Sequence, residues 1–118
     1  MQSLLGRFSN YRLLLFIATK TQISQGVQGQ THTLTFGIST FTDSSPPDSG
    51  QGSYTYNANG PVAGLTLLYT ATAVGGQLQP GDQDALTMTY VTTNSGTFTG
   101  TLTSGTNTVT SSGNFQVQ

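Results

Sequence analysis

Apolar residues alternate with small polar residues, mostly threonines, through much of the chain from residue 31 onward. In the first such stretch, one face consists of His32, Leu34, Phe36 and Ile38, and threonines take most of the positions between them. A β-strand points successive side chains to opposite faces, so a period of two residues is typical of a half-buried strand. No segment has the 3.6-residue period of an amphipathic helix. The sequence therefore predicts an all-β protein.

The composition supports this fold class. Threonine, which is β-branched and disfavours helix interiors, occurs at 22 positions, while glutamate is absent and lysine occurs once. Charged residues make up 6% of the chain, against about 25% in typical domains. Disordered chains combine high net charge with few aromatic residues, whereas this chain has a net charge of −1, five tyrosines and six phenylalanines. With 118 residues, it is expected to form one β domain over residues 1–118.

The N-terminal segment places two arginines before a short apolar run, which suggests either an export signal or a strand. As a signal the run is too short, with six apolar residues, and no small-residue cleavage site follows. As a strand over residues 8–22 it is apolar on both faces, and Leu13, Leu15 and Phe16 are candidate interaction residues. Such a strand should be covered on two sides, by its own domain or by a neighbouring molecule. Residues 1–7 are expected to form a flexible start.

Turn-forming residues divide the rest of the chain. Phe41 breaks the parity of the strand that begins at residue 31, which predicts a β-bulge near residues 37–40. Long loops rich in Pro, Gly and Asp are expected at residues 43–52 and 75–84. The remaining strands are predicted at residues 53–56, 62–74, 85–92, 97–103, 108–110 and 115–117.

About eight strands joined mostly by short turns favour a single antiparallel meander. A small barrel is favoured over a two-sheet sandwich, because closure removes edges that an almost uncharged sheet cannot protect with lysines.

Four tyrosines are candidate ligand-binding residues, because they recur on the apolar parity of three predicted strands. They are Tyr54, Tyr56, Tyr69 and Tyr90. Tyrosine rings at a barrel mouth can stack on a sugar or a small apolar ligand. Ordinary packing in the core or between strands is the favoured explanation for them.

The ionisable residues offer little catalytic chemistry. His32 is the single histidine, so it is interpreted either as a lone general base or as a strand residue that makes one hydrogen bond. Asp43 and Asp48 on one loop, and Asp82 and Asp84 on the other, are solvated turn residues or ligands for calcium, which accepts six to eight oxygens. A glycosidase pair is disfavoured, because nothing nearby would keep one carboxyl protonated.

Several function classes are excluded or disfavoured. The chain has no cysteine and no nucleophile or phosphate-loop motif, so no catalytic residue, metal or cofactor is predicted, and we expect a protein that is not an enzyme. Its three basic residues are too few to grip a phosphate backbone, which argues against nucleic acid as a partner. The longest apolar run is far shorter than the roughly 20 residues of a transmembrane helix.

The second half of the chain resembles a threonine- and glycine-rich repeat pattern of bacterial secreted and cell-surface proteins. The resemblance covers about residues 52–118. The segments that carry it are Ser53-Tyr-Thr-Tyr, Ala63-Gly-Leu-Thr-Leu-Leu-Tyr69, Leu86-Thr-Met-Thr-Tyr90, Ser95-Gly-Thr-Phe-Thr-Gly-Thr101 and Ser112-Gly-Asn-Phe-Gln-Val117. It implies a small calycin-like barrel and carries over no functional residue.

These observations lead to two hypotheses about function. The first is a structural or assembly module of an extracellular filament, matrix or cell-surface protein, which associates with itself or with neighbouring surface-protein domains. The alternative is a β-barrel that binds a glycan or a small apolar ligand. An extracellular or cell-surface location fits the low charge and the abundance of threonine, serine, glutamine and glycine.

Overall fold

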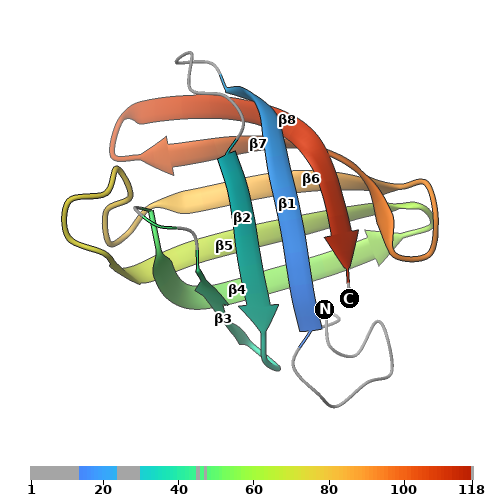
Figure 1. The fold of residues 1–118 in the computed structure, drawn as a ribbon, viewed down its shortest axis with the longest axis horizontal. Coiled ribbons are helices and arrows are strands. Elements are labelled where there is room, and N and C mark those ends of the chain that lie inside the picture. The colour runs from blue at the N-terminus through green and yellow to red at the C-terminus, as the bar shows by residue number, and fades with distance from the viewer. Residues whose placement is uncertain (1–13, 24–29, 45, 47, 118) are drawn as a thin grey trace.

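The computed structural model describes residues 14–23, 30–44, 46 and 48–117, and for residues 14–23 and 30 it describes the backbone alone. Eight antiparallel strands form a closed barrel in this part of the chain (Figure 1). They are β1 (Leu14–Ile23), β2 (Gln30–Phe36), β3 (Thr40–Asp43), β4 (Gly50–Asn59), β5 (Val62–Thr72), β6 (Gln83–Tyr90), β7 (Ser95–Ser104) and β8 (Asn107–Val117). Each strand pairs with the next, and β1 pairs with β8 to close the barrel. The predicted all-β meander and barrel are confirmed.

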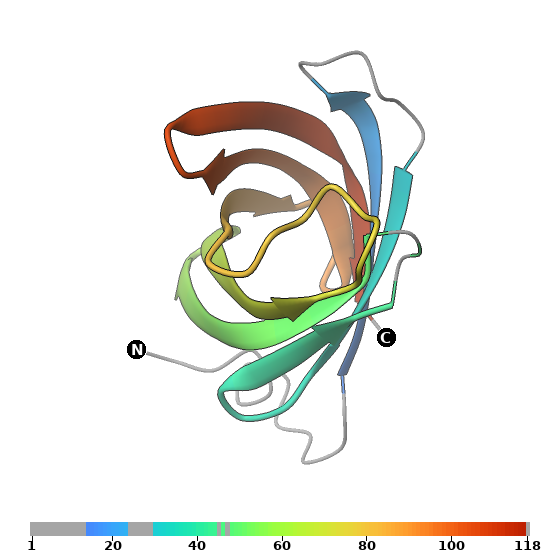
Figure 2. The ribbon, with the colours of Figure 1, turned by 90° about the vertical axis from the view of Figure 1, so that its left-hand side faces the viewer.

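The two ends of the barrel differ. One end carries the short connections at residues 37–39, 60–61 and 91–94, and we call it the short-turn end. The opposite end carries the longer connections at residues 44–49 and 73–82 together with the tight turn at 105–106, and we call it the long-loop end. In Figure 2 the β5–β6 connection crosses the opening of the barrel at the long-loop end.

Alternation places the large apolar side chains inside the barrel. The largest fully buried side chains are Tyr56, Phe36, Phe41, Leu65, Leu67 and Met88. Aromatic rings pack edge to face, as between Phe36 and Tyr54, whose centroids lie 4.8 Å apart. An eight-stranded barrel is just wide enough for side chains to fill it, and here they fill most of it.

The parity change at Phe41 marks a hairpin rather than the predicted bulge. β2 ends at Phe36, the chain reverses, and the amide of Gly37 donates to the carbonyl of Thr40 at 2.8 Å. Phe36 and Phe41 then face each other as partners on β2 and β3. Ile38 lies in the turn and is exposed, although its parity predicted an inward position.

Three predicted boundaries shift. The expected loop at 43–52 is the shorter 44–49, and the expected loop at 75–84 is 73–82, because strand pairing extends into both predicted loops. The two short strands expected near the C-terminus are one strand, β8, which pairs with β7 without interruption from Asn107 to Gln116. Of the predicted N-terminal strand, the structure describes Leu14–Ile23, and residues 1–13 lie outside the described residues.

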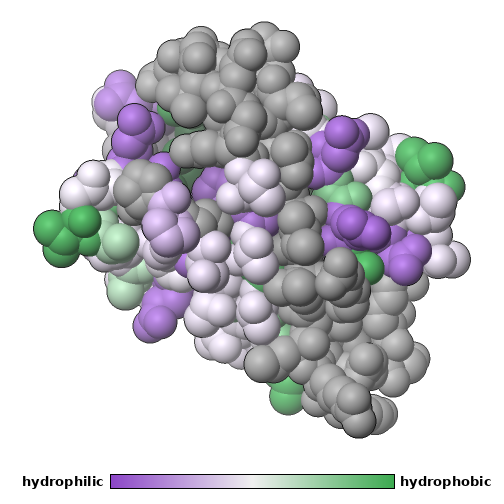
Figure 3. Space-filling view, viewed as in Figure 1, coloured by the Kyte–Doolittle hydropathy of each residue, from purple (hydrophilic) through white to green (hydrophobic). Residues whose placement is uncertain are grey.

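The outer surface carries no charge over most of the barrel. From residue 31 to residue 117, leaving out 45 and 47, the sequence has no lysine or arginine, and all of its aspartates are buried. In Figure 3 the coloured surface is mainly pale or purple, and the strongly apolar residues stand apart at its edges. Outward threonines cover much of this surface, as the alternation predicts.

Candidate functional site

The four acidic residues of the chain are buried at the long-loop end of the barrel, where Asp43, Asp48 and Asp84 form a polar cluster with His32 and Tyr69. They are Asp43, Asp48, Asp82 and Asp84, and none is more than 6% exposed. This corrects the expectation of solvated turn aspartates. Asp43 is the last residue of β3 and Asp84 the second residue of β6, so both occupy inward positions of strands.

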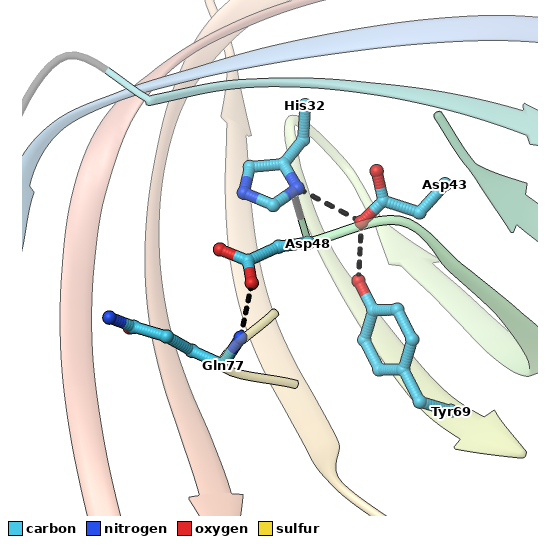
Figure 4. A network of polar contacts seen from close by, with 5 residues as sticks. All are labelled: His32, Asp43, Asp48, Tyr69 and Gln77. Carbon is cyan, nitrogen blue, oxygen red and sulfur yellow. Dashed lines mark hydrogen bonds and ion pairs between the residues drawn. The ribbon is translucent and has the colours of Figure 1, made fainter. Parts of the chain in front are cut away.

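Asp43 joins His32 and Tyr69 through a single oxygen atom (Figure 4). Its Oδ2 lies 2.9 Å from Nδ1 of His32 and accepts a hydrogen bond of 2.8 Å from the hydroxyl of Tyr69. A carboxylate has acceptor sites only, so Nδ1 of His32 donates when Asp43 is ionised. Of the two readings of His32, the interior ring with a hydrogen bond describes its place in the structure.

Strand register explains how these three residues meet. Leu34 on β2 is the direct partner of Asp43 on β3, so His32, two residues from Leu34, is the diagonal neighbour of Asp43. Tyr69 comes from β5 and must reach across β4. Gly50 on β4 permits this, because a Cβ atom there would lie 2.8 Å from the Tyr69 ring.

Burial is the main cause of the raised pKa of Tyr69. Desolvation, and then the charge of Asp43 beside the hydroxyl, raise the pKa of Tyr69 far above its ordinary value of 10.0. Tyr69 therefore remains a neutral hydrogen-bond donor to Asp43 at physiological pH.

This raised pKa predicts how stability depends on alkaline pH. In the unfolded chain Tyr69 ionises above about pH 10, whereas in the barrel it stays protonated. Its contribution is therefore complete below pH 10 and is lost above it, by up to about 1.4 kcal/mol per pH unit. Urea unfolding at pH 9, 10 and 11 should show this loss in the wild type and a shallower loss in Tyr69→Phe. Equal slopes in the two proteins would contradict the assignment.

The carboxylates of Asp48 and Asp82 bond backbone amides of the β5–β6 loop, residues 73–82. Oδ1 of Asp48 accepts a 2.6 Å hydrogen bond from the amide of Gln77, and Oδ2 of Asp82 accepts one of 2.9 Å from the amide of Gln79. Between these two amides, the side chain of Leu78 is buried in the core. The loop is thus fixed over the barrel opening by the side chain of Leu78 and the carboxylate of Asp48, while Asp82 stabilises the loop from within.

A small cavity lies inside the barrel next to this cluster. It is lined by His32, Leu34, Leu67, Tyr69, Asp84, Leu86 and Phe98. The empty space in and around it, including space open to solvent, is about 250 Å³. About one water molecule fits in the cavity.

The polar cluster lacks the arrangement of a metal site built from several side chains. No three His, Asp or Glu side chains in the described part of the chain are arranged to hold a metal ion. The calcium interpretation of Asp82 and Asp84 therefore gains no support, because the Asp82 carboxylate bonds a loop amide instead.

The predicted tyrosines lie mainly in the core. Tyr54, Tyr56 and Tyr69 are buried and Tyr90 is half-buried, so the ring faces of the first three are not available at the surface for a sugar. The hydroxyl of Tyr54 donates to the carbonyl of Gly37, and those of Tyr56 and Tyr90 lie 3.1 Å apart. Of these four, Tyr69 alone belongs to the polar cluster.

The three apolar candidates belong to the N-terminal segment. Leu15 and Phe16 lie on β1, with only their backbone described, and Leu13 lies outside the described residues.

Sequence analysis missed the polar cluster, although parity contained a signal for it. Asp43 comes two residues after the inward Phe41, and Asp84 two residues before the inward Leu86. The surrounding Gly, Pro and Ser residues pointed to loops instead. Which inward residues meet depends on strand register, which a single sequence does not display.

Comparisons with protein-family models, with curated proteins and with solved structures give no match for this chain. The resemblance to bacterial surface repeats therefore stays a prediction. Among the residues that the structure describes, no helix is long and apolar enough to cross a membrane.

Proposed function

We propose that this protein is a non-enzymatic structural or assembly module of an extracellular filament, matrix or cell-surface protein. The observation that carries the proposal is the uncharged, hydroxyl-rich outer surface of residues 31–117, leaving out 45 and 47. Proteins that must stay apart usually carry surface charge, and a net charge near zero promotes association. A second copy of the chain, or a neighbouring domain of the same kind, can approach this surface without electrostatic repulsion.

Outward side chains on β6, β7 and β8 form the best candidate for the contact surface. Register places Thr87, Thr99 and Ser112 in one row across the three strands, and Ala85, Thr101 and Thr110 in the next. These residues line an external hollow of about 400 Å³. Threonine offers a methyl group for packing and a hydroxyl that both donates and accepts, so such rows are complementary to one another. We call this surface the hydroxyl hollow.

The alternative function, an open cup for a glycan or a small apolar ligand, is favoured less. Side chains fill the barrel interior, and three of the four tyrosines that could stack on a sugar are buried there. Ligand-binding pockets usually have volumes of about 300 to 1,000 Å³, whereas the cavity inside this barrel has room for about one water molecule.

Placing charge in the hydroxyl hollow tests the assembly proposal. We expect the wild type to associate with rising concentration in sedimentation equilibrium, and Thr99→Lys/Thr101→Lys to weaken that association at least about tenfold, because two lysines repel their counterparts on the next copy. The matched control Thr42→Lys/Thr55→Lys places the same charge on the exposed faces of β3 and β4. It should associate like the wild type.

Two results would overturn the proposal. A wild type that stays monomeric at all concentrations, including by electron microscopy, would argue against assembly. Equal weakening by both double variants would argue against the hydroxyl hollow as the contact surface. Circular dichroism would establish that each variant keeps its strands.

A further inference from the structure

The β5–β6 loop resembles a closed lid more than an ordinary connection. It crosses the barrel opening at the long-loop end (Figure 2). Leu78 inserts into the core, while the residues on either side of it, Gln77 and Gln79, are exposed. The loop is also fixed at its two ends, because Ala73 donates to the carbonyl of Ser49 and Gly81 to that of Tyr69. Leu78 is thus an apolar plug in the mouth of the barrel.

The cavity at this end of the barrel has two kinds of wall. Four of its lining side chains are apolar, namely Leu34, Leu67, Leu86 and Phe98. The others are the imidazole of His32, the hydroxyl-bearing ring of Tyr69 and the carboxylate of Asp84. Small-molecule sites usually combine apolar walls with a few convergent polar groups in this way.

Packing alone does not account for the polar wall. Placing a carboxylate inside a barrel costs free energy, and an apolar side chain of similar size would fill the same space at lower cost. Asp84 occupies such a position and is 4% exposed, on a strand whose other inward residues include Leu86 and Met88. Ionisable side chains kept at this cost in a cavity are typical of binding sites.

We propose that the cavity is the closed form of a ligand chamber, with residues 73–82 as its lid, and that the ligand is a small amine with an apolar body. When the lid lifts, Leu78 leaves the mouth of the barrel and the apolar body of the ligand takes its place against the leucines and Phe98. The ammonium head pairs with Asp84, with Tyr69 and His32 beside it. This site is inside the barrel, so it is separate from the proposed assembly surface.

The charge of the head follows from the groups around the chamber. Asp43 bonds two polar residues of the wall, His32 and Tyr69, so a second carboxylate lies directly behind them. Asp48 holds the lid above. His32 is the one basic side chain among residues 31–117, leaving out 45 and 47, so a cation is favoured there and an anion is repelled.

Three probes of one shape and different charge test this inference. Benzylamine is cationic at pH 7, benzyl alcohol is neutral and benzoate is anionic. Titration calorimetry should detect benzylamine binding to Leu78→Ala at least tenfold tighter than to the wild type, because the variant needs no displacement of the plug. Benzyl alcohol should bind at least tenfold more weakly than benzylamine, and benzoate should give no signal.

Matched variants locate the binding. Asp84→Asn in the Leu78→Ala background keeps the size of the side chain and removes its charge, so benzylamine binding should fall at least tenfold. Leu68→Ala removes a leucine from the outer face of β5 and should bind benzylamine as the wild type does.

The wild type supplies a measurement that does not depend on a variant. Saturating benzylamine should speed the hydrogen exchange of the Gln77 amide, because lifting the lid breaks its bond to Asp48, whereas the bond from Gln79 to Asp82 lies within the lid and persists. Absence of benzylamine binding to the wild type and to folded Leu78→Ala, together with unchanged exchange, would overturn the chamber. Equal binding of all three probes would overturn the cationic class of ligand. Neither measurement depends on self-association, so the assembly proposal stands or falls separately.

Discussion

Replacing Asp43 with alanine is expected to lower the free energy of unfolding by about 3 kcal/mol or more. One carboxylate oxygen bonds both His32 and Tyr69, and all three side chains are buried. Alanine cannot accept a hydrogen bond, so two buried groups lose this partner at once, and a space the size of the carboxylate opens between β2 and β5. Urea unfolding at pH 7, followed by circular dichroism, measures the effect.

Two further variants separate the polar bonds from general damage. Asp43→Asn keeps the volume and one acceptor oxygen, so its loss should be clearly smaller than that of Asp43→Ala. Asp82→Ala removes a buried carboxylate at the same end of the barrel, but one that accepts a bond from a loop amide rather than joining two side chains, and should cost about 1 kcal/mol. If all three variants lose equal stability, the shared oxygen of Asp43 has no special role.

The fold was largely predictable because alternation is a local property. In β6 inward apolar residues alternate with outward threonines from Leu86 to Thr89, and burial follows the predicted parity at Leu86 and Met88. The all-β class, the meander and the barrel follow from such strands and from the short turns between them. No long-range information is needed for that step.

Boundaries failed where two structures give the same local pattern. A bulge and a tight hairpin both reverse parity, so the sequence around Gly37 did not distinguish them. The observed hairpin is defined by the pairing of Phe36 with Phe41, which is a contact between strands. Likewise, Ser112 and Gly113 have the composition of a turn, but continuous pairing with β7 and β1 makes them part of β8.

The polar cluster was harder to predict than the fold, because it depends on three strand registers together. His32 meets Asp43 through the pairing of β2 with β3, and Tyr69 reaches Asp43 across β4 through the missing side chain of Gly50. Parity alone would have turned Asp43 and Asp84 inward. It could not have shown that Asp43 bonds both His32 and Tyr69 through one oxygen, while Asp84 lines the adjoining cavity.

The second large loss of stability is expected from replacing Gly52 on β4. We expect Gly52→Ala to lower the free energy of unfolding by about 3 kcal/mol. The pairing of β4 with β5 shifts register between Gln51 and Gly52, and the two backbones approach closely there. A Cβ atom on residue 52 would overlap the carbonyl oxygen of Leu68, which belongs to the backbone and cannot rotate away. The strands must separate to accept it, which also moves Tyr69 away from Asp43.

Gly64→Ala is the matched control, because Gly64 lies on the neighbouring strand of the same hairpin and no atom lies within 4 Å of its added Cβ. Alanine restricts the unfolded chain more than glycine does, so this variant should be unchanged or more stable by up to about 1 kcal/mol. Thermal and urea unfolding of both variants measure the contrast. If Gly52→Ala is as stable as Gly64→Ala, the close approach of β4 and β5 does not require glycine. The register shift between Gln51 and Gly52, which aligns Tyr69 with Asp43, would then not depend on a glycine at residue 52.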